Sequence, residues 1–457
     1  MTADESAPAS GVDSASAYAR DPDADPFDRG VAEALDDDDP LAAYRDQFSI
    51  PDDELYFDGN SLGLQSTAAV ESLDRVTEEW RELAIRGWED GDPDWFHFAE
   101  HLADRVAPLV GAAPSEVTVA NSTTTNVHTL IGTFLDTLPG TPGGPEPSAE
   151  APAVLVDDLD FPTDHYAIRA QFRQRGIDPD EKLRTVASRD GRTIHPADVE
   201  AALDAHDDVG IVFLPSVLYR SGQLFDLERI TAAAHEHDAL AGFDLAHSVG
   251  VVPHDLAAHD VDFAVWCSYK YLNAGPGAVA GLYVADRHHG TTPALAGWWG
   301  NDKETQFEMR QTFDPADGAG AWQIGTIPML SAAPVEGAAE TIGEAGIDRV
   351  RAKSVALTDY LIALVDALPA EFTVGTPRDP TERGGHVAIE HPEGYRLSEA
   401  LRDRGVVVDF RPPNVVRVCP SPLYTRFVDV LAVAEELRDL AASGAYETYD
   451  PRDGGVT

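Results

Sequence analysis

Residues 267–278 read CSYKYLNAGPGA, and they contain one of only four lysines in a chain of 457 residues. This lysine, Lys270, follows a strand-like run and precedes a Gly-rich turn; the others are Lys182, Lys303 and Lys353. Such a lysine can simply bury its aliphatic stem. However, a lysine kept where arginine supplies almost every other positive charge is expected to do what arginine cannot. Schiff-base formation is that chemistry, because it requires an amine that loses its proton near neutral pH.

The composition of the chain is strongly acidic. There are 80 Asp and Glu residues against 33 Lys and Arg, which gives a formal net charge of -47. A charge of this sign and size excludes nucleic acid and anionic membrane surfaces as partners. It resembles the surface of proteins from haloarchaea and other salt-in halophiles, where concentrated cations screen the self-repulsion of the chain. We therefore interpret the acidity as an adaptation to salt and not as part of a catalytic site.

The length and the 43% of hydrophobic residues allow a large core, divided into two or three domains or subdomains. The first ten residues, MTADESAPAS, have neither the basic nor the apolar region of a signal peptide, and no apolar run reaches the ~18 residues of a membrane span. We expect a cytoplasmic protein. Cys267 and Cys419 are the only cysteines, which excludes a disulfide framework and a cysteine zinc site, and no other metal site is predicted.

The pattern of the chain predicts an α/β fold. Between residues 115 and 285 the short apolar runs VTVA, AVLVD, GIVFLP, LAGFDL, DFAVW and VAGLYV alternate with helical stretches such as DLERITAAAHEHD. This alternation indicates a mixed, mainly parallel sheet. The predicted division is an acidic disordered arm (1–40), a helical segment with a substrate-site loop (41–110), a large cofactor-binding domain (111–334), a small α+β domain (335–445) and a tail (446–457).

A Schiff-base lysine points to pyridoxal 5′-phosphate, which needs a carboxylate at its ring nitrogen, a phosphate cradle and a stacking group. Asp244 ends the strand-like run of LAGFDLAHSVG, where open α/β sheets bind ligands, although it can equally cap a helix. In VTVANSTTTNVHTL, Thr123 and Thr124 open a helix whose N-terminus can bind phosphate, although Ser and Thr also cap helices without a ligand. Phe161 is either the stacking ring or a core residue.

These signals occur in a compatible order, and the chain from about residue 45 to 440 resembles the kynureninase family. The segments that carry the resemblance are YFDGNSLGLQ, FPTDHYAI, GFDLAHSVG, CSYKYLNAG, GWWG and RVCPSPLY. The resemblance implies the aspartate-aminotransferase-like fold, pyridoxal phosphate and a homodimer whose active site is shared between subunits. It also implies hydrolysis of L-kynurenine, or of 3-hydroxykynurenine, to anthranilate or 3-hydroxyanthranilate and L-alanine by cleavage of the Cβ–Cγ bond.

The resemblance assigns roles to individual residues. Lys270 would form the Schiff base and move the α-proton, Asp244 would pair with the ring nitrogen, and Tyr269 would contact the phosphate and take part in proton transfer. The other cofactor contacts that it implies are Thr123, Thr124, Phe161, Asp164, Ser216 and His247, with Trp298 and Thr326 supplied by the partner subunit. The substrate contacts that it implies are Arg417, for the α-carboxylate, and Asn60, Ser61 and Trp88.

Trp88 departs from animal members of the family, which have a histidine against the substrate ring. Tryptophan stacks and does not favour a hydrogen bond to a ring hydroxyl, so we expect a preference for kynurenine over 3-hydroxykynurenine.

Two alternatives to this function stay open. A cysteine desulfurase or selenocysteine lyase shares the fold and the cofactor but needs a cysteine on a mobile loop, and neither Cys267 nor Cys419 is well placed for that role. A non-catalytic binding protein with the same fold would have no use for Lys270, Asp244 and Arg417.

Overall fold

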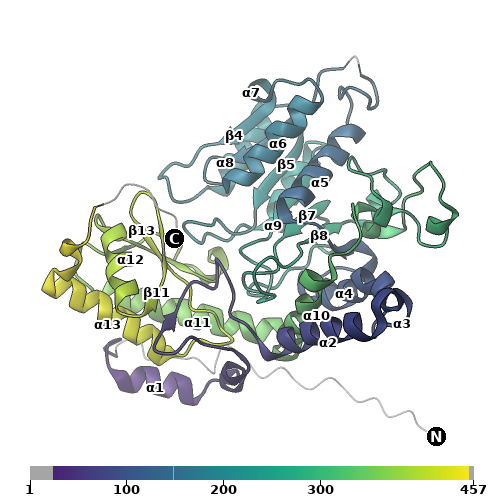
Figure 1. The fold of residues 1–457 in the computed structure, drawn as a ribbon. Coiled ribbons are helices and arrows are strands. Elements are labelled where there is room, and N and C mark those ends of the chain that lie inside the picture. Colours follow the sequence, from purple (N-terminus) through teal and green to yellow (C-terminus); the bar gives the residue numbers. More distant parts are fainter. Residues whose placement is uncertain (1–23, 148, 452–457) are drawn as a thin grey trace, which may run out of the picture.

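The computed structural model describes residues 24–147 and 149–451, which form a large α/β domain beside a smaller α+β domain (Figure 1). The large domain is built on a seven-stranded sheet in which β4, β3, β5, β6 and β7 run parallel, whereas β8 is antiparallel to both β7 and β2. The predicted α/β fold with a mixed, mainly parallel sheet is therefore confirmed. In spatial order the strands are β2 (Val117–Val119), β8 (Gly281–Val284), β7 (Phe263–Trp266), β6 (Leu240–Asp244), β5 (Val209–Pro215), β3 (Ala153–Asp157) and β4 (Leu183–Val186).

Helices cover both faces of this sheet, which is why the strands read as continuous apolar runs. Successive side chains of a strand point to opposite faces, and the two cores follow that alternation. Val154 and Ile211 belong to the core beneath α5 (Thr123–Thr137) and α6 (Pro162–Gln174), whereas Leu155 and Val212 belong to the core on the opposite face. The other helices of this domain are α7 (Pro179–Lys182), α8 (Pro196–Ala205) and α9 (Leu227–Glu236).

The segment before the large sheet is helical, as its sequence suggested. Its helix α2 packs along α10, and the two lie side by side at the base of the large domain (Figure 1). Gly337 of α10 permits this close approach, because a Cβ there would clash with the backbone carbonyl of Ala68. The helices before the sheet are α2 (Thr67–Leu83), α3 (Gly87–Asp90) and α4 (Phe98–Val106). Helix α10 (Met329–Ala345) follows the sheet in the sequence.

The small domain is a four-stranded antiparallel sheet covered by helices. A separate parallel pair, β1 (Leu55–Tyr56) with β11 (Val406–Val407), ties the N-terminal part of the chain to it. The sheet order is β12 (Asp409–Arg411), β13 (Val415–Val418), β10 (Val387–Glu390) and β9 (Thr373–Val374), with helices α11 (Ile347–Asp366), α12 (Gly394–Asp403) and α13 (Phe427–Ser443).

The prediction of a disordered arm over residues 1–40 is wrong for residues 24–40. Residues 29–37 form a helix, α1, which lies against α13 (Figure 1). The Asp36 carboxylate accepts hydrogen bonds from the backbone N–H groups of Phe427 and Val428, at 2.7 and 3.1 Å. These groups are the orphan donors at the start of α13, so Asp36 caps that helix from a distant part of the chain. The rest of the predicted arm, residues 1–23, lies outside the described residues.

Two smaller differences separate the structure from the sequence-based expectation. The strand β4 was not predicted, because LRTV carries Arg184 and is only half buried. The predicted tail begins with ordered chain: Tyr446 and Tyr449 pack against the core of the small domain, and the Tyr449 hydroxyl lies 2.8 Å from the Asp403 carboxylate. Residues 452–457 lie outside the described part. Within residues 24–147 and 149–451, no helix is long and apolar enough to cross a membrane, and no His, Cys, Asp and Glu cluster suits a metal ion.

Candidate active site

Lys270 lies in the turn that follows β7, at the edge of the large sheet where the parallel strands end. The backbone N–H of Gly63 donates to the carbonyl of Tyr269 at 2.7 Å, so the N-terminal segment fastens this turn. Position 63 accepts only glycine, because a Cβ would clash with the Lys270 carbonyl. The Lys270 ammonium nitrogen Nζ lies 2.9 Å from Nε2 of His247. The predicted lysine and its predicted neighbour His247 are therefore in contact.

Asp244 ends β6, one strand away from the strand that leads to Lys270. Its Oδ1 accepts a hydrogen bond from the backbone N–H of Ala246 at 2.7 Å. The Ser216 hydroxyl, predicted to contact the cofactor, lies 3.2 Å from the Asp244 backbone carbonyl and 2.6 Å from the Ser248 hydroxyl. Ser216 thus contacts the turn that carries Asp244, and its contact with the cofactor stays a prediction.

Three further carboxyl groups cluster with Asp244. Burial raises the pKa of Asp244, although the nearby Lys270 ammonium lowers it. Burial also raises the pKa of Asp160 and of Asp164 well above the usual range, and the neighbouring carboxyls act in the same direction; burial raises the pKa of Asp157 to about 7. Raised pKa values on several buried carboxyls indicate too little compensating positive charge nearby. A protonated ring nitrogen placed against Asp244 would supply such a charge, so these residues fit the predicted cofactor ring.

The helix α5 supplies the candidate phosphate cradle. Asn121 has a positive φ of 60°, and Ser122 caps the helix by accepting from the Thr125 backbone N–H at 3.3 Å. Thr123 and Thr124 occupy the first turn, where backbone N–H groups have no partner within the helix. The Thr124 hydroxyl also lies 2.9 Å from the Thr163 hydroxyl. The fit to a phosphate rests on a helix N-terminus flanked by hydroxyl groups.

One small cavity joins the ring-site residues. Phe161, Tyr219, Asp244 and His247 all line it. Phe161 is 46% exposed and meets Tyr219 edge to face, with ring centroids 5.4 Å apart. It is therefore not a core residue, and its exposed face is available for stacking on a planar ligand.

Arg417 approaches the same region from the small domain. It is 1% exposed, and its Nε donates to Asp409 Oδ1 at 2.6 Å while Nη2 pairs with the second oxygen of that carboxylate. Its Nη1 donates to the backbone carbonyl of Tyr219 at 2.6 Å, and Nη2 donates to the Ser61 hydroxyl at 3.0 Å. Asp409 thus fills one side of the guanidinium, and the end that carries Nη1 and Nη2 faces Ser61 and Tyr219.

Asn60 and Ser61 follow β1 and lie between the two domains. The Asn60 side chain is fully buried, and neither of its amide atoms has a hydrogen-bond partner among the described residues. Asp58, two residues earlier, lies close to the same charges: burial and the Asp409 carboxylate raise its pKa to about 6. Buried polar groups without partners indicate that a polar ligand completes this part of the site.

The structure does not bring Trp88, Trp298 and Thr326 to the cavity around Asp244. Trp88 packs on Trp95 and Trp299, with ring centroids 5.7 and 5.4 Å apart. It lines a second, mainly apolar cavity of about 1020 Å³ that also borders residues 273–276, just beyond Lys270. Trp298 is 49% exposed and Thr326 is exposed.

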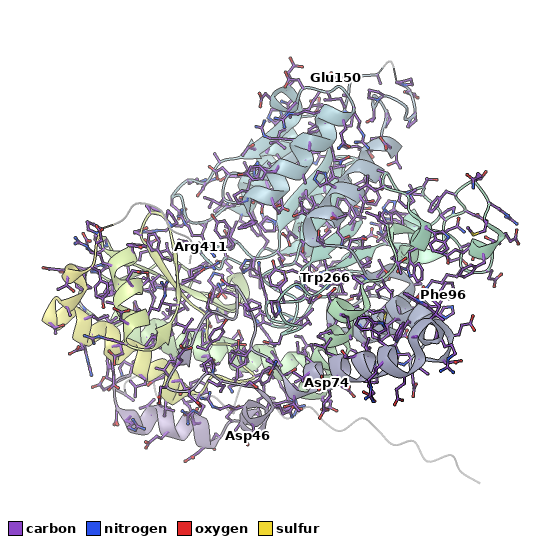
Figure 2. The ribbon with its side chains drawn as sticks, in the orientation of Figure 1. Asp46, Asp74, Phe96, Glu150, Trp266 and Arg411 are labelled. Atoms are coloured by element: carbon purple, nitrogen blue, oxygen red, sulfur yellow. The ribbon has the colours of Figure 1, made fainter. Side chains whose placement is uncertain are left out.

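Four residues of this region were not predicted: Asp58, His386, Asp409 and Arg411. Arg411 lies 2.6 Å from the Asp409 carboxylate, on the side of the small domain that faces the large sheet (Figure 2). The signal in the sequence was the alternation of VVVDFRPPNVVRVC, which puts Asp409, Arg411 and Arg417 on one face once their strands are paired. That pairing is not visible in the sequence alone.

Comparison with known proteins identifies the family. Residues 350–437 match the kynureninase C-terminal domain. The chain is 44% identical over 420 residues to a kynureninase of Geobacillus thermodenitrificans, covering 92% of this chain and 95% of that protein. It is also 44% identical over 430 residues to a kynureninase of Bacillus cereus, covering 93% and 98%. The chain belongs to the kynureninase family.

Solved structures share the fold of this family member at lower identity. An apo cysteine desulfurase of Thermococcus onnurineus NA1 matches with a TM-score of 0.73 at 18% identity, covering 88% of this chain and 98% of that one. A lysine-to-alanine mutant of C-DES, with glycine covalently linked to the PLP cofactor, matches with a TM-score of 0.74 at 19% identity, covering 86% and 99%. At this identity the likeness supports the fold alone.

The two thiols of the chain bear on the alternative of a cysteine desulfurase or selenocysteine lyase. Cys267 and Cys419 are both free and buried. Burial raises the pKa of both thiols, that of Cys419 to about 12. The thiolate is the reactive form of cysteine, so neither side chain is activated for attack.

Proposed function

We propose that the protein is a kynureninase that hydrolyses L-kynurenine to anthranilate and L-alanine with pyridoxal 5′-phosphate as cofactor. The observation that carries this proposal is the 44% identity to kynureninases over more than 90% of the chain. The site supports it independently. Lys270 and Asp244 from the large sheet and Arg417 from the small sheet converge on one region, which suits a ligand with an amino group at one end and a carboxylate at the other.

The residues present fit the proposed cofactor. Asp244 and the carboxyls around it would hold the protonated ring nitrogen, Phe161 would stack on the ring, and the first turn of α5 would hold the phosphate. When bound through Lys270, this cofactor supplies an electron sink that accepts the charge left on the substrate Cα.

The chain supplies the binding and proton-transfer groups. The end of the Arg417 guanidinium, together with the Ser61 hydroxyl, would bind the α-carboxylate. The contact between Lys270 Nζ and His247 Nε2 gives the lysine amine a partner with which to exchange a proton. Burial raises the pKa of Tyr269, which keeps its phenol protonated near neutral pH. Its phenol can therefore donate a hydrogen bond, whereas the phenolate that a base for hydration of the substrate carbonyl requires is disfavoured.

The test is anthranilate fluorescence after the purified protein, pyridoxal phosphate and L-kynurenine are mixed in molar KCl. We expect anthranilate from the wild type and none from Lys270→Ala. Lys182→Ala is the matched control, because Lys182 pairs with Glu150 and Asp208 just before β4, at the end of the large sheet opposite to Lys270. A wild type that loads the cofactor but releases no anthranilate contradicts the proposal.

We also propose that kynurenine is preferred over 3-hydroxykynurenine. The support is Trp88, whose ring lines the large cavity beyond Lys270 and is fixed by Trp95 and Trp299. A ring at this position offers stacking and no partner suited to a substrate hydroxyl. The ratio of kcat/KM for the two substrates tests this, and Trp88→His should shift the ratio toward the hydroxylated one. An unchanged ratio in Trp88→His would contradict the role of Trp88.

A homodimer that shares its active site is a further part of the proposal. Its support is that Trp298 and Thr326 are exposed and do not line the cavity around Asp244, and that exposed Trp80 and Leu330 line the large cavity. Mixing inactive Lys270→Ala with inactive Trp298→Ala should restore part of the activity, because one site of each mixed dimer is then intact. No recovery in mixed dimers would count against a shared site.

We propose that the fold requires salt, and the support for this is composition alone. The Geobacillus and Bacillus relatives are bacterial and do not support a haloarchaeal source. At a net charge of -47, cations should reduce the self-repulsion of the folded chain. Activity should fall as KCl is lowered from molar to millimolar, and full activity without salt would contradict this interpretation. A cytoplasmic location stays a prediction, to be checked by cell fractionation.

A further inference from the structure

One face of the small sheet gathers the unpredicted polar residues. Arg417 pairs with Asp409 on one side and with Ala388 on the other, in the registers β12–β13 and β10–β13. Residues two apart on a strand share a face, so His386, immediately before β10, lies on the same face as Ala388. This places His386 beside the Arg417–Asp409 pair, although the three residues are far apart in the sequence.

The His386 ring makes no hydrogen bond of normal distance and angle with a described residue, although the Arg220 backbone lies near enough to act on its pKa. Its side chain is 0% exposed, and neither Nδ1 nor Nε2 is in a hydrogen bond with a described residue. Burial lowers its pKa to about 3, the Arg417 charge acts in the same direction, and Asp409 and the Arg220 backbone oppose it. The ring is therefore neutral at physiological pH and carries one N–H donor and one acceptor. A buried donor without a partner is costly, which indicates that a ligand supplies the partner.

The surroundings of the ring indicate which ligand this is. The His386 ring lies 5.9 Å, centroid to centroid, from the ring of His247, which contacts the Lys270 amine. Arg417 is the cross-strand partner of Ala388, which lies two residues from His386 on the same face, so its charge lies near the His386 ring. Gly222 keeps the space around it, because a Cβ there would lie 2.8 Å from the His386 carbonyl and 3.3 Å from its Nε2. A ligand that reaches from Lys270 to Arg417 passes this ring, close to its carboxylate end.

Arg417 itself leaves room for a second donor. The Arg417 groups Nε and Nη2 donate to the Asp409 carboxylate, and Nη2 also donates to the Ser61 hydroxyl. Nη1 donates to the Tyr219 carbonyl. A substrate carboxylate has about four acceptor positions, more than this partly occupied guanidinium can fill.

We propose that His386 is a further substrate-binding residue, whose ring N–H donates a hydrogen bond to the α-carboxylate that Arg417 binds. This inference rests on the proposed function, since it takes the ligand to be an α-amino acid. The contact is the same in the bound substrate and in later states, because the carboxylate does not react. Its loss should therefore raise KM and leave kcat nearly unchanged.

The test compares His386→Leu, which removes both ring nitrogens at similar volume, with His386→Gln, which keeps a neutral donor. Holoenzymes in molar KCl are titrated calorimetrically with L-alanine, which has an α-carboxylate, and with anthranilate, whose carboxylate is on the ring. We expect His386→Leu to weaken L-alanine binding by about 10- to 100-fold, the loss expected for a hydrogen bond to a charged group. His386→Gln should stay within about threefold of the wild type, because its amide still donates. Anthranilate binding should not change in either variant.

Controls separate this role from a structural one. His391→Leu removes a histidine beyond the other end of β10 and should leave both affinities unchanged. If His386→Leu does not fold, His386→Ala takes its place in the comparison with His386→Gln. L-Alanine binding that is unaffected by His386→Leu, or lost equally in the Leu and Gln variants, overturns the inference. A wild type that binds L-alanine but releases no anthranilate refutes the proposed function alone, while the His386 comparison still decides this contact.

Discussion

The buried ion pair between Lys353 and Asp39 allows a quantitative test of how the N-terminal segment is held. The two charged atoms lie 2.7 Å apart, and each side chain is 2% exposed. The Leu41 backbone N–H also donates to Asp39, at 2.9 Å. Burial lowers the pKa of Lys353 more than the attraction of Asp39 and Asp36 raises it. For Lys353, the cost of burial thus outweighs the attraction of its partners, as is common in buried ion pairs.

This balance predicts a strongly non-additive result. Lys353→Met leaves the Asp39 carboxylate buried without its ammonium partner, so the free energy of unfolding should fall by about 3–5 kcal/mol. Asp39→Leu leaves the ammonium buried and should cost a similar amount. The double variant Lys353→Met with Asp39→Leu removes both charges and should lose far less than the sum of the single losses, about 1–3 kcal/mol, because the Leu41 N–H then lacks its acceptor.

Urea unfolding of the small domain, in KCl held constant, measures these differences. Arg29→Ala is the control, because the Arg29–Glu33 pair lies on the same N-terminal segment but is exposed, and it should change stability by less than about 1 kcal/mol. The reasoning is refuted if Lys353→Met stays within about 1 kcal/mol of the wild type, or if the double variant loses the sum of the single losses.

Three further predictions concern the site. Burial and Asp409 raise the pKa of Asp58 to about 6, so Asp58 becomes negatively charged as the pH rises through that value. This charge should repel the substrate carboxylate and raise KM for kynurenine. Asp58→Asn should therefore flatten the dependence of KM on pH. Asp244→Asn should lower kcat by about 100-fold or more with little change in Tm, measured by anthranilate release and thermal unfolding. Cys267→Ala should keep anthranilate release within about threefold of the wild type, because a buried thiol with a raised pKa is not a nucleophile, whereas a large loss would favour a thiol mechanism.

The parts of the fold that were predictable are those that local sequence determines. Strands β3, β5 and β6 are buried on both faces, so each reads as an apolar run between polar segments. Strand β4 was missed because its half-buried residues include Arg184, which pairs with Asp208. Helix α1 was missed because its acidic, Ala-rich sequence resembles a solvated arm, and only its contacts with α13 reveal its role.

The scarcity of lysine is a signal that the structure qualifies. Lys182 pairs with Glu150 and Asp208, and Lys353 pairs with Asp39. The few lysines of this chain therefore include two that form ion pairs. Scarcity alone does not distinguish a catalytic lysine from a structural one. Lys270 differs because its Nζ contacts the histidine His247 where these two contact carboxylates.

The substrate end of the site depends on pairings that sequence cannot show. Residues 219–224 leave the large sheet and run to the small one: Gly384 N–H donates to the Gly222 carbonyl at 2.8 Å, and Leu224 N–H donates to the Glu382 carbonyl at 2.8 Å. The same segment gives its Tyr219 carbonyl to Arg417. This segment, together with residues 61–63, connects the edge of the large sheet that carries Lys270 to the face of the small sheet that carries Arg417. Selectivity for α-amino acids should therefore depend on this connection as much as on the charged groups, because moving the small sheet would shift Arg417 and His386 together away from Lys270.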